Sequence, residues 1–91
     1  MNRIELPEPT QAGGVQIWHV GRATTEPFTG REVWLHYSRS GPDNTPVWLI
    51  VIVGFTGLES RRETRKTASG VRGRLGKLFD AQAVHLTGWV R

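Results

Sequence analysis

Apolar and polar residues alternate in stretches that predict β-strands. Residues 15–20 and 32–37 alternate as half-buried strands do, whereas residues 47–55 are apolar almost throughout. Side chains that are apolar on both faces are typical of a strand in the middle of a sheet. We therefore predict three consecutive strands, of which the third is central.

Turn-forming residues separate these strands. Residues 21–30 are polar, and residues 38–46 are rich in Gly, Pro, Asp, Asn and Ser, which indicates a hairpin loop. At the N-terminus, Pro7 and Pro9 interrupt regular pairing. The predicted domain organisation is an extended N-terminal arm over residues 1–14 and a single α+β domain over residues 15–91.

The pattern changes to a helical period after the third strand. Ser60 and Glu63 match a capping box, with Ser at the N-cap and Glu three residues later. On a helical wheel over residues 61–79, the apolar side chains form one stripe and the basic side chains lie opposite. We predict a basic amphipathic helix over this range, followed by a last strand over residues 83–90.

Three glycines within that range allow three interpretations of the second half of the predicted helix. Gly70, Gly73 and Gly76 would each weaken a helix by about 1 kcal/mol relative to Ala. They could let a polyanion approach the backbone, they could end the helix near Gly70, or they could form a contact between helices in an oligomer.

The predicted fold is a two-layer α+β domain. Its element order is β-β-β-α-β, with a mainly antiparallel four-stranded sheet and the basic helix on one face. Alternation along the strands assigns Trp34, Trp48 and Trp89 to the opposite face. Trp18 lies on the same face if it points to the same side of the first strand as Gln16 and Val20.

A Trp-rich face is not expected to remain in water. A second copy could cover it as a symmetric homodimer, or the arm could fold over it with Ile4 and Leu6 as anchors. The Trp side chains could also stack on unpaired bases, or form an ordinary small core under the arm and loops. The four candidate interface residues are Trp18, Trp34, Trp48 and Trp89.

The positive charge is concentrated in one segment. The chain has 12 Lys and Arg residues and 8 Asp and Glu residues, a formal net charge of +4. Residues 61–77 hold seven of the basic residues and one acid, so their net charge is +6, and the remainder has five basic residues and seven acids, so its net charge is −2. Crowded Arg side chains repel one another unless an anion is present, and phosphates bind Arg bidentately. The predicted phosphate contacts are Arg61, Arg62, Arg65, Lys66, Arg72, Arg74 and Lys77, with Arg22, Arg31 and Arg39 as loop candidates.

Residue types that are missing exclude several classes of protein. The chain has no Cys, which excludes disulfide frameworks, thiol nucleophiles and Cys-based zinc sites and favours the cytoplasm. The N-terminal residues lack the apolar stretch of a signal peptide, and the longest apolar run, residues 47–53, is too short to cross a membrane.

The sequence shows no catalytic or metal-binding pattern that we would assign. His36 and His85 share the predicted Trp face. His19 lies on that face only if the first strand has the opposite alternation, in which Trp18 points to the other side. Histidines on strands are more often polar neighbours of aromatic rings than zinc ligands, so we expect no metal and no cofactor. A small His-dependent nuclease is the least favoured hypothesis.

Two hypotheses follow from the charge and the Trp residues. The first is a small, non-catalytic protein that binds DNA or RNA through the phosphate backbone with residues 61–77. The alternative is a protein-interaction module of the kind found in phages and mobile elements, which binds host machinery through the cationic helix, on an acidic partner, or through the Trp face.

Overall fold

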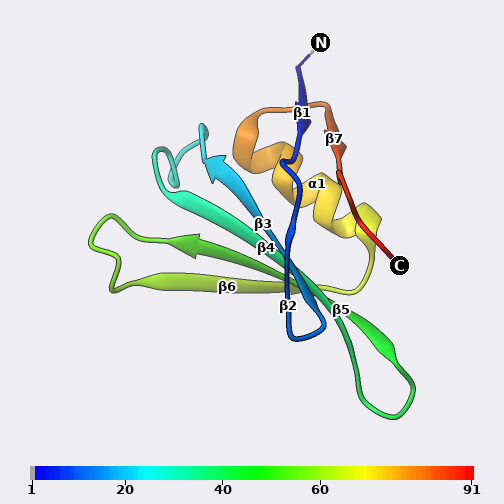
Figure 1. Cartoon of the computed structure of the whole chain (residues 1–91). Coiled ribbons are helices and arrows are strands. Elements are labelled where there is room, and N and C mark those ends of the chain that lie inside the picture. The colour runs from blue at the N-terminus through cyan, green and yellow to red at the C-terminus, as the bar shows by residue number, and fades with distance from the viewer. Residues whose placement is uncertain (1) are drawn as a thin grey trace.

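Five antiparallel strands form the main sheet of the computed structural model, which describes residues 2–91 (Figure 1). The order across the sheet is β2-β3-β4-β5-β6. Two further strands, β1 and β7, form a separate parallel pair, and one helix, α1, follows β6. The elements are β1 (Arg3–Glu5), β2 (Thr10–Ala12), β3 (Val15–Arg22), β4 (Glu32–Ser40), β5 (Thr45–Val53), β6 (Ser60–Arg65), α1 (Ala68–Phe79) and β7 (Ala83–His85).

The mixed α+β class and the three consecutive strands are confirmed. β5 lies between β4 and β6, so the prediction that the long apolar run is a central strand is also confirmed. The predicted number of strands in the sheet is wrong, because the sheet has five strands rather than four. Three strands, β1, β2 and β6, were not predicted, and β2 and β6 are the edges of the main sheet.

The predicted helix over residues 61–79 begins too early. Residues 60–65 are strand β6, paired with β5, so the Ser60–Glu63 capping box does not form. The N-cap is Thr67, whose Oγ1 accepts a hydrogen bond from the Gly70 backbone N–H at 3.0 Å. The apolar β5 strand needs a hydrogen-bonded neighbour on each edge, and that requirement outweighs the local capping signal.

The helix continues through all three glycines to Phe79, so the alternative in which it ends near Gly70 is wrong. Val71, Leu75 and Leu78 are buried against the sheet, and this packing outweighs the cost of the glycines. The helix ends at Asp80, whose backbone N–H bonds the Gly76 carbonyl oxygen. A Cβ atom at Gly76 would lie 2.7 Å from the Ala81 carbonyl oxygen, whereas one at Gly73 would meet nothing within 4 Å.

The last strand is shorter than predicted, and it does not join the main sheet. β7 covers Ala83–His85 and pairs in parallel with β1 (Figure 1). The Leu6 backbone N–H extends this pairing to the His85 carbonyl oxygen at 3.1 Å. The predicted N-terminal arm is therefore part of the folded body, because it supplies β1 and the edge strand β2.

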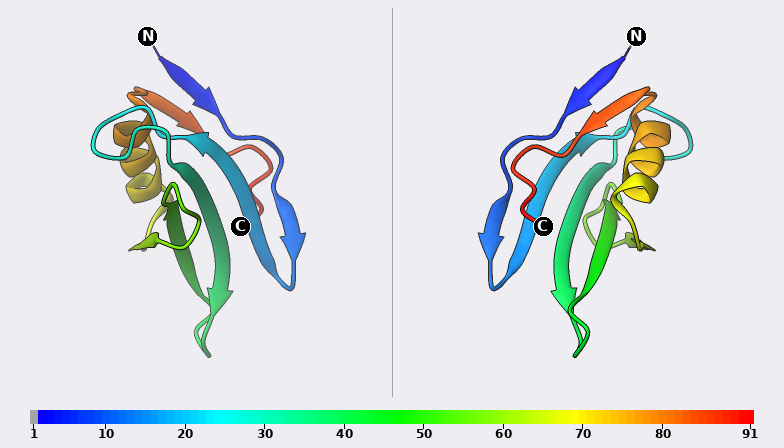
Figure 2. Two further views of the ribbon diagram at one scale, coloured as in Figure 1. Left: turned by 90° about the vertical axis from the view of Figure 1, so that its left-hand side faces the viewer. Right: turned by 90° about the vertical axis from the view of Figure 1, so that its right-hand side faces the viewer.

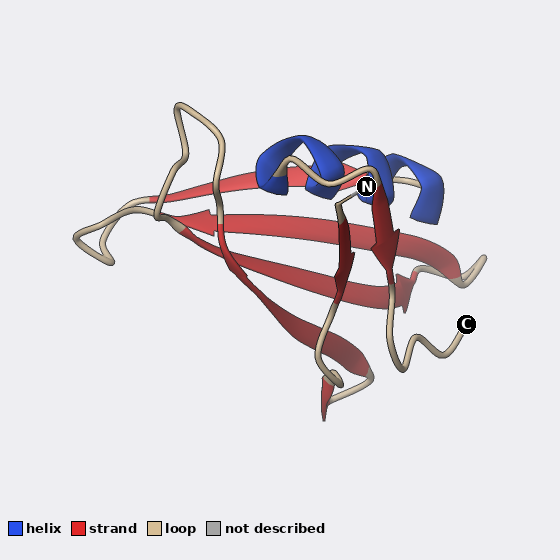
Figure 3. Ribbon diagram, turned by 90° about the horizontal axis from the view of Figure 1, so that it is seen from above, coloured by secondary structure: helices blue, strands red, loops and turns tan. Residues whose placement is uncertain are grey.

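The predicted division of the sheet into an aliphatic face and a Trp face is wrong. The β4–β5 hairpin pairs Ser40 with Thr45, and this register pairs Tyr37 with Trp48 and so places their side chains on the same face. That face is the core, and α1 lies along it beside β6 (Figures 2 and 3). The buried apolar residues are Leu6, Trp18, Ala23, Val33, Leu35, Tyr37, Trp48, Ile50, Ile52, Val71, Leu75, Leu78, Phe79 and Leu86.

Aromatic rings fill the part of the core that α1 does not reach. The Trp48 ring lies 6.1 Å from Trp18, 4.3 Å from Tyr37 and 5.1 Å from Trp89, measured between centroids. The Trp18 indole N–H donates to the Thr87 carbonyl oxygen at 2.8 Å. The Gln16 side chain both donates to and accepts from the Val90 backbone, at 2.6 and 3.1 Å. These bonds hold the C-terminal segment against β3.

Substitutions of Gly73 and Gly76, two of the three glycines of α1, should have opposite effects on stability. Gly73→Ala should raise the free energy of unfolding by about 0.5–1 kcal/mol, because Ala has the higher helix propensity and the site is open. Gly76→Ala should lower it by about 1–3 kcal/mol, because the new Cβ would collide with the Ala81 carbonyl oxygen. Urea denaturation followed by circular dichroism measures both, and a stabilising Gly76→Ala would contradict the described helix end.

Candidate nucleic-acid interface

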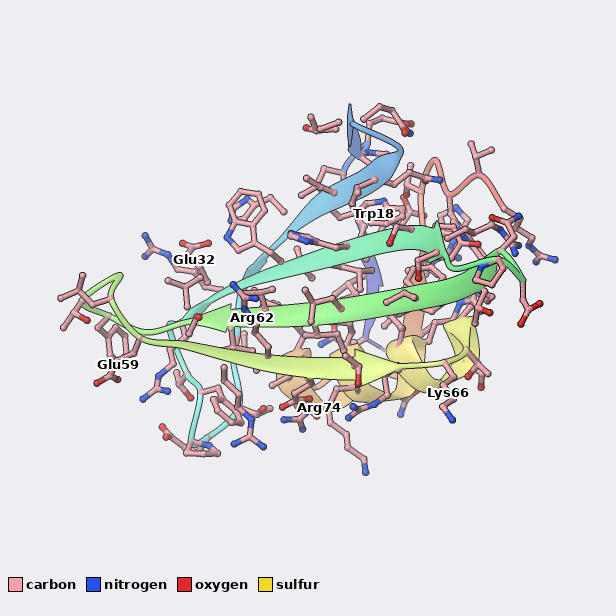
Figure 4. The ribbon with its side chains drawn as sticks, turned by 90° about the horizontal axis from the view of Figure 1, so that it is seen from below. Trp18, Glu32, Glu59, Arg62, Lys66 and Arg74 are labelled. Atoms are coloured by element: carbon pink, nitrogen blue, oxygen red, sulfur yellow. The ribbon has the colours of Figure 1, made fainter. Side chains whose placement is uncertain are left out.

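The seven predicted phosphate contacts lie on two elements instead of one helix. Arg61, Arg62 and Arg65 belong to β6, Lys66 follows it, and Arg72, Arg74 and Lys77 belong to α1. Because α1 runs beside β6, Arg61, Arg65 and Arg74 still meet, at a margin of the molecule that we call the β6–α1 edge (Figure 4). Arg72 and Lys77 lie beside the groove between α1 and β7, and Arg72 Cζ is 5.9 Å from the centroid of the Trp89 ring. Arg62 is also apart, because its alternate position on β6 places it on the other face of the sheet, opposite α1.

A single carboxylate organises the centre of this edge. Arg74 binds Glu63 with two hydrogen bonds, Nε to Oε1 at 2.7 Å and Nη2 to Oε2 at 2.9 Å. Arg61 Nε donates to Glu63 Oε2 at 2.8 Å, and Arg65 Nη2 donates to Oε1 at 3.4 Å. The Glu63 side chain is only 9% exposed. Three guanidinium groups therefore share one carboxylate, which leaves a local excess of positive charge.

The hydrogen bonds set the protonation of the pair. The two bonds from Arg74, and then the bond from Arg61, lower the pKa of Glu63 below its usual value, against the opposing effect of burial. The same contact with Glu63 raises the pKa of Arg74. Both groups are therefore charged at neutral pH, and the pair joins α1 to the edge strand.

Three guanidinium groups lie over the Phe28 ring at the same edge. Arg31, Arg61 and Arg74 each lie over it, with Cζ 5.8, 5.5 and 5.6 Å from the ring centroid. These distances fit cation–π contacts. Arg31 forms no ion pair with any carboxylate in residues 2–91. Four Arg side chains thus converge on one carboxylate and one aromatic ring.

Apart from Arg62, the remaining predicted cations lie outside this cluster, Lys66 between β6 and α1 and the other two on α1. Lys66, Arg72 and Lys77 are exposed. Arg72 and Lys77 flank a groove of about 730 Å³ between the helix and β7, and Gly73 and Gly76 form part of its floor. No atom would contact a Cβ at Gly73, so the helix backbone is accessible there. At Gly76 the close approach of the Ala81 carbonyl oxygen explains why the residue is glycine.

Of the three loop candidates, only Arg31 joins the cluster. Arg22 Nε donates to Glu32 Oε1 at 3.0 Å, at the end of β3. Arg39 Nη1 donates to the Asn44 carbonyl oxygen at 2.9 Å, within the β4–β5 hairpin.

The four candidate Trp residues do not form one interface. Trp18 and Trp48 are buried in the core, and Trp89 is half-buried beside them. Trp34 alone lies on the opposite face of the sheet, 36% exposed, with the His19 ring 4.5 Å away.

No helix or strand among residues 2–91 covers the face that carries Trp34, which we call the open face. Half-buried aliphatic side chains surround Trp34 there, and Arg22, Glu32 and Arg62 are charged residues on the face. Desolvation, followed by the charge of Arg62, lowers the pKa of His36. The strand pairing places on the open face Thr10, Ala12, Val15, Ile17, His19, Arg22, Glu32, Trp34, His36, Ser38, Val47, Leu49, Val51, Val53, Ser60, Arg62 and Thr64.

The His residues do not meet as the sequence analysis placed them. His36 is on β4 of the main sheet and His85 is on β7 of the separate pair. Among residues 2–91, no group of three or more His, Asp or Glu side chains could hold a metal ion. Within the same residues, no helix has the length and hydropathy needed to cross a membrane.

Comparisons with protein-family models, with curated proteins and with solved structures give no match for this chain.

Two central residues of the cluster, Glu63 and Phe28, were not among the predicted site residues. Glu63 was assigned to a helix cap, although Arg61, Glu63 and Arg65 alternate with period two, as side chains on one face of a strand do. Nothing in the local sequence marks Phe28, because its loop is brought to the edge only by the tertiary fold.

Glu63→Gln should destabilise the protein by about 1–3 kcal/mol at pH 7, because three Arg side chains lose a charged acceptor. The folded-state pKa of Glu63 lies below 4.5, so its stabilisation is present above pH 4.5 and is lost as the pH falls through the folded pKa. Urea titrations from pH 7 to pH 3 should therefore show a steeper loss in the wild type than in the variant. Glu5→Gln, an exposed control, should change stability by less than about 0.5 kcal/mol; equal effects of the two variants would contradict the role of Glu63.

Proposed function

We propose that this chain is a non-catalytic protein that binds the phosphate backbone of DNA or RNA along the β6–α1 edge. The proposal rests on one observation above all: the Arg61, Arg65 and Arg74 guanidinium groups share a single carboxylate, and Arg31 lies with two of them over the Phe28 ring. A cytoplasmic location, which the lack of Cys favours, belongs to the same proposal.

The electrostatics of the edge favour a polyanion. Like charges at this spacing repel one another, and a bound anion removes that cost. Glu63 and Phe28 already fix the orientation of the guanidinium groups, so little side-chain entropy is lost when phosphates bind. The exposed Lys66, Arg72 and Lys77 continue the positive surface from β6 over the helix.

Such contacts give affinity without reading the bases. Phosphate contacts position a nucleic acid, whereas sequence is read at base edges, and the exposed side chains of the edge are mainly Lys and Arg. We therefore expect binding that depends steeply on salt and weakly on sequence.

The proposal can be tested by fluorescence anisotropy. Labelled double-stranded DNA, single-stranded DNA and RNA are each titrated with the protein at salt concentrations from about 25 to about 200 mM. Lys66→Gln combined with Lys77→Gln should reduce the slope of log K against log salt by about 0.7–0.9 per charge removed. Both lysines are exposed, so the variant should keep its fold.

The matched control is Arg3→Gln combined with Arg39→Gln. It removes the same net charge from β1 and from the β4–β5 hairpin, and it should leave the slope nearly unchanged. The proposal would be contradicted if the slope of log K against log salt fell equally in both double variants. It would also be contradicted if no oligonucleotide bound at the lowest salt. Binding to polyglutamate as tight as to the oligonucleotides would assign the edge to an acidic protein instead.

The second candidate, a protein-interaction module of the phage or mobile-element type, is favoured by the open face. The face presents Trp34 among aliphatic side chains, and it carries both an acid, Glu32, and a base, Arg62. A surface with both charges can be complementary to itself across a two-fold axis, so the occupant we consider is a second copy of this chain.

Sedimentation equilibrium checks this candidate. At concentrations of tens of micromolar, the dimer should have twice the chain mass of 10.2 kDa. Trp34→Ser should shift the mass toward the monomer, whereas Leu58→Ser, at a side chain 92% exposed outside the face, should not. A wild-type protein that remains monomeric throughout would remove the homodimer.

A further inference from the structure

A small pocket lies where the loop before β4 meets the start of β6. Its volume is about 400 Å³, and Phe28 and Arg31 line it from the loop while Ser60 and Arg61 line it from the strand. Ile52, Gly54 and Glu59 complete the lining. Figure 4 shows this end of the sheet, with Glu59 labelled next to the β5–β6 turn.

Arg31 is held in this pocket with an unsatisfied donor. Its guanidinium lies between the rings of Phe28 and Phe55, 5.8 and 5.6 Å from their centroids. Its Nε is buried and has no hydrogen-bond partner. A buried donor without an acceptor is costly, and a negatively charged acceptor in the pocket would remove that cost.

The loop is built to keep Arg31 in place. The Ala23 backbone N–H donates to the Arg31 carbonyl oxygen at 2.9 Å, and the Gly30 N–H donates to the Ala23 carbonyl oxygen at 2.7 Å. Gly30 has a φ of +86°, and a Cβ there would lie 3.2 Å from the Phe55 ring. The backbone of Arg31 is therefore held in place, and its guanidinium packs between two aromatic rings.

Arg61 supplies a second guanidinium with donors to spare. Its Nε donates to Glu63, and its terminal nitrogens form no hydrogen bond in the described part of the chain. Both Arg61 and Arg31 lie over the Phe28 ring. The pocket therefore offers two cationic groups and the Ser60 hydroxyl, against the single carboxylate of Glu59.

We propose that this pocket binds a terminal phosphate group, the phosphomonoester at the end of a nucleic acid that lies along the β6–α1 edge. A monoester carries a charge of about −1.5 to −2 at pH 7, more than an internal diester, and it offers three oxygens to the two guanidinium groups. Arg61 belongs both to the pocket and to the edge. This inference rests on the proposed function and gives it a preference for phosphorylated ends.

The test compares one ten-nucleotide strand with a 5′-phosphate, with a 3′-phosphate and with hydroxyls at both ends, by anisotropy at fixed salt. The wild type should bind one phosphorylated form about tenfold more tightly than the hydroxyl form. Arg31→Gln should abolish that preference. Any weakening that comes from the loss of one positive charge at the edge should be the same for all three strands. Glu59→Gln should increase the preference, because the only acid in the pocket lining loses its charge.

The control is Arg22→Gln. Arg22 is bound to Glu32 and lies outside this pocket, so its loss should leave the preference intact. A titration of the wild type with inorganic phosphate, followed by amide NMR shifts, should move the signals of residues 28–31 and 60–61, and this measurement does not depend on any variant folding.

The outcomes separate the two proposals. Equal binding of all three strands, with no response to Glu59→Gln, would overturn the pocket inference alone. Tight binding of phosphorylated strands and none of the hydroxyl strand would support the pocket and overturn the edge. No binding of any strand would overturn both.

Discussion

The central strand β5 imposes the constraint on which the remaining structure depends. Its side chains are apolar on both faces and its backbone groups must be paired on both edges, so it requires two neighbouring strands. β4 supplies one neighbour through the hairpin. The other neighbour is residues 60–65, which carry a helix-capping pattern but pair with β5 as strand β6. This pairing brings Glu63 beside α1 and creates the cationic edge.

Local patterns were sufficient for the class of fold and for the three consecutive strands, because those segments are long and strongly patterned. They were not sufficient where a long-range contact decides the structure. The parity of Trp48 depends on the register of the β4–β5 hairpin, which pairs it with Tyr37. The short strands β1 and β7 exist only because they pair with each other across the whole length of the chain.

The candidate site, like the fold, was predictable from the sequence only in part. The concentration of charge in residues 61–77 is visible in the sequence, and in the fold three of the seven basic side chains, Arg61, Arg65 and Arg74, meet at Glu63. The organisation of that charge is not visible. It depends on the Glu63–Arg74 pair between two elements, and on Phe28, which a loop brings to the same place.

The position of the charge on an edge strand has one more consequence. β6 has a partner only on its β5 side, and an unpaired strand edge is a template for another chain. Mutual repulsion of the Arg side chains would oppose pairing between copies of β6. A polyanion that neutralises those side chains would also remove this barrier, so that neighbouring copies on one strand of nucleic acid could join edge to edge into a continuous sheet.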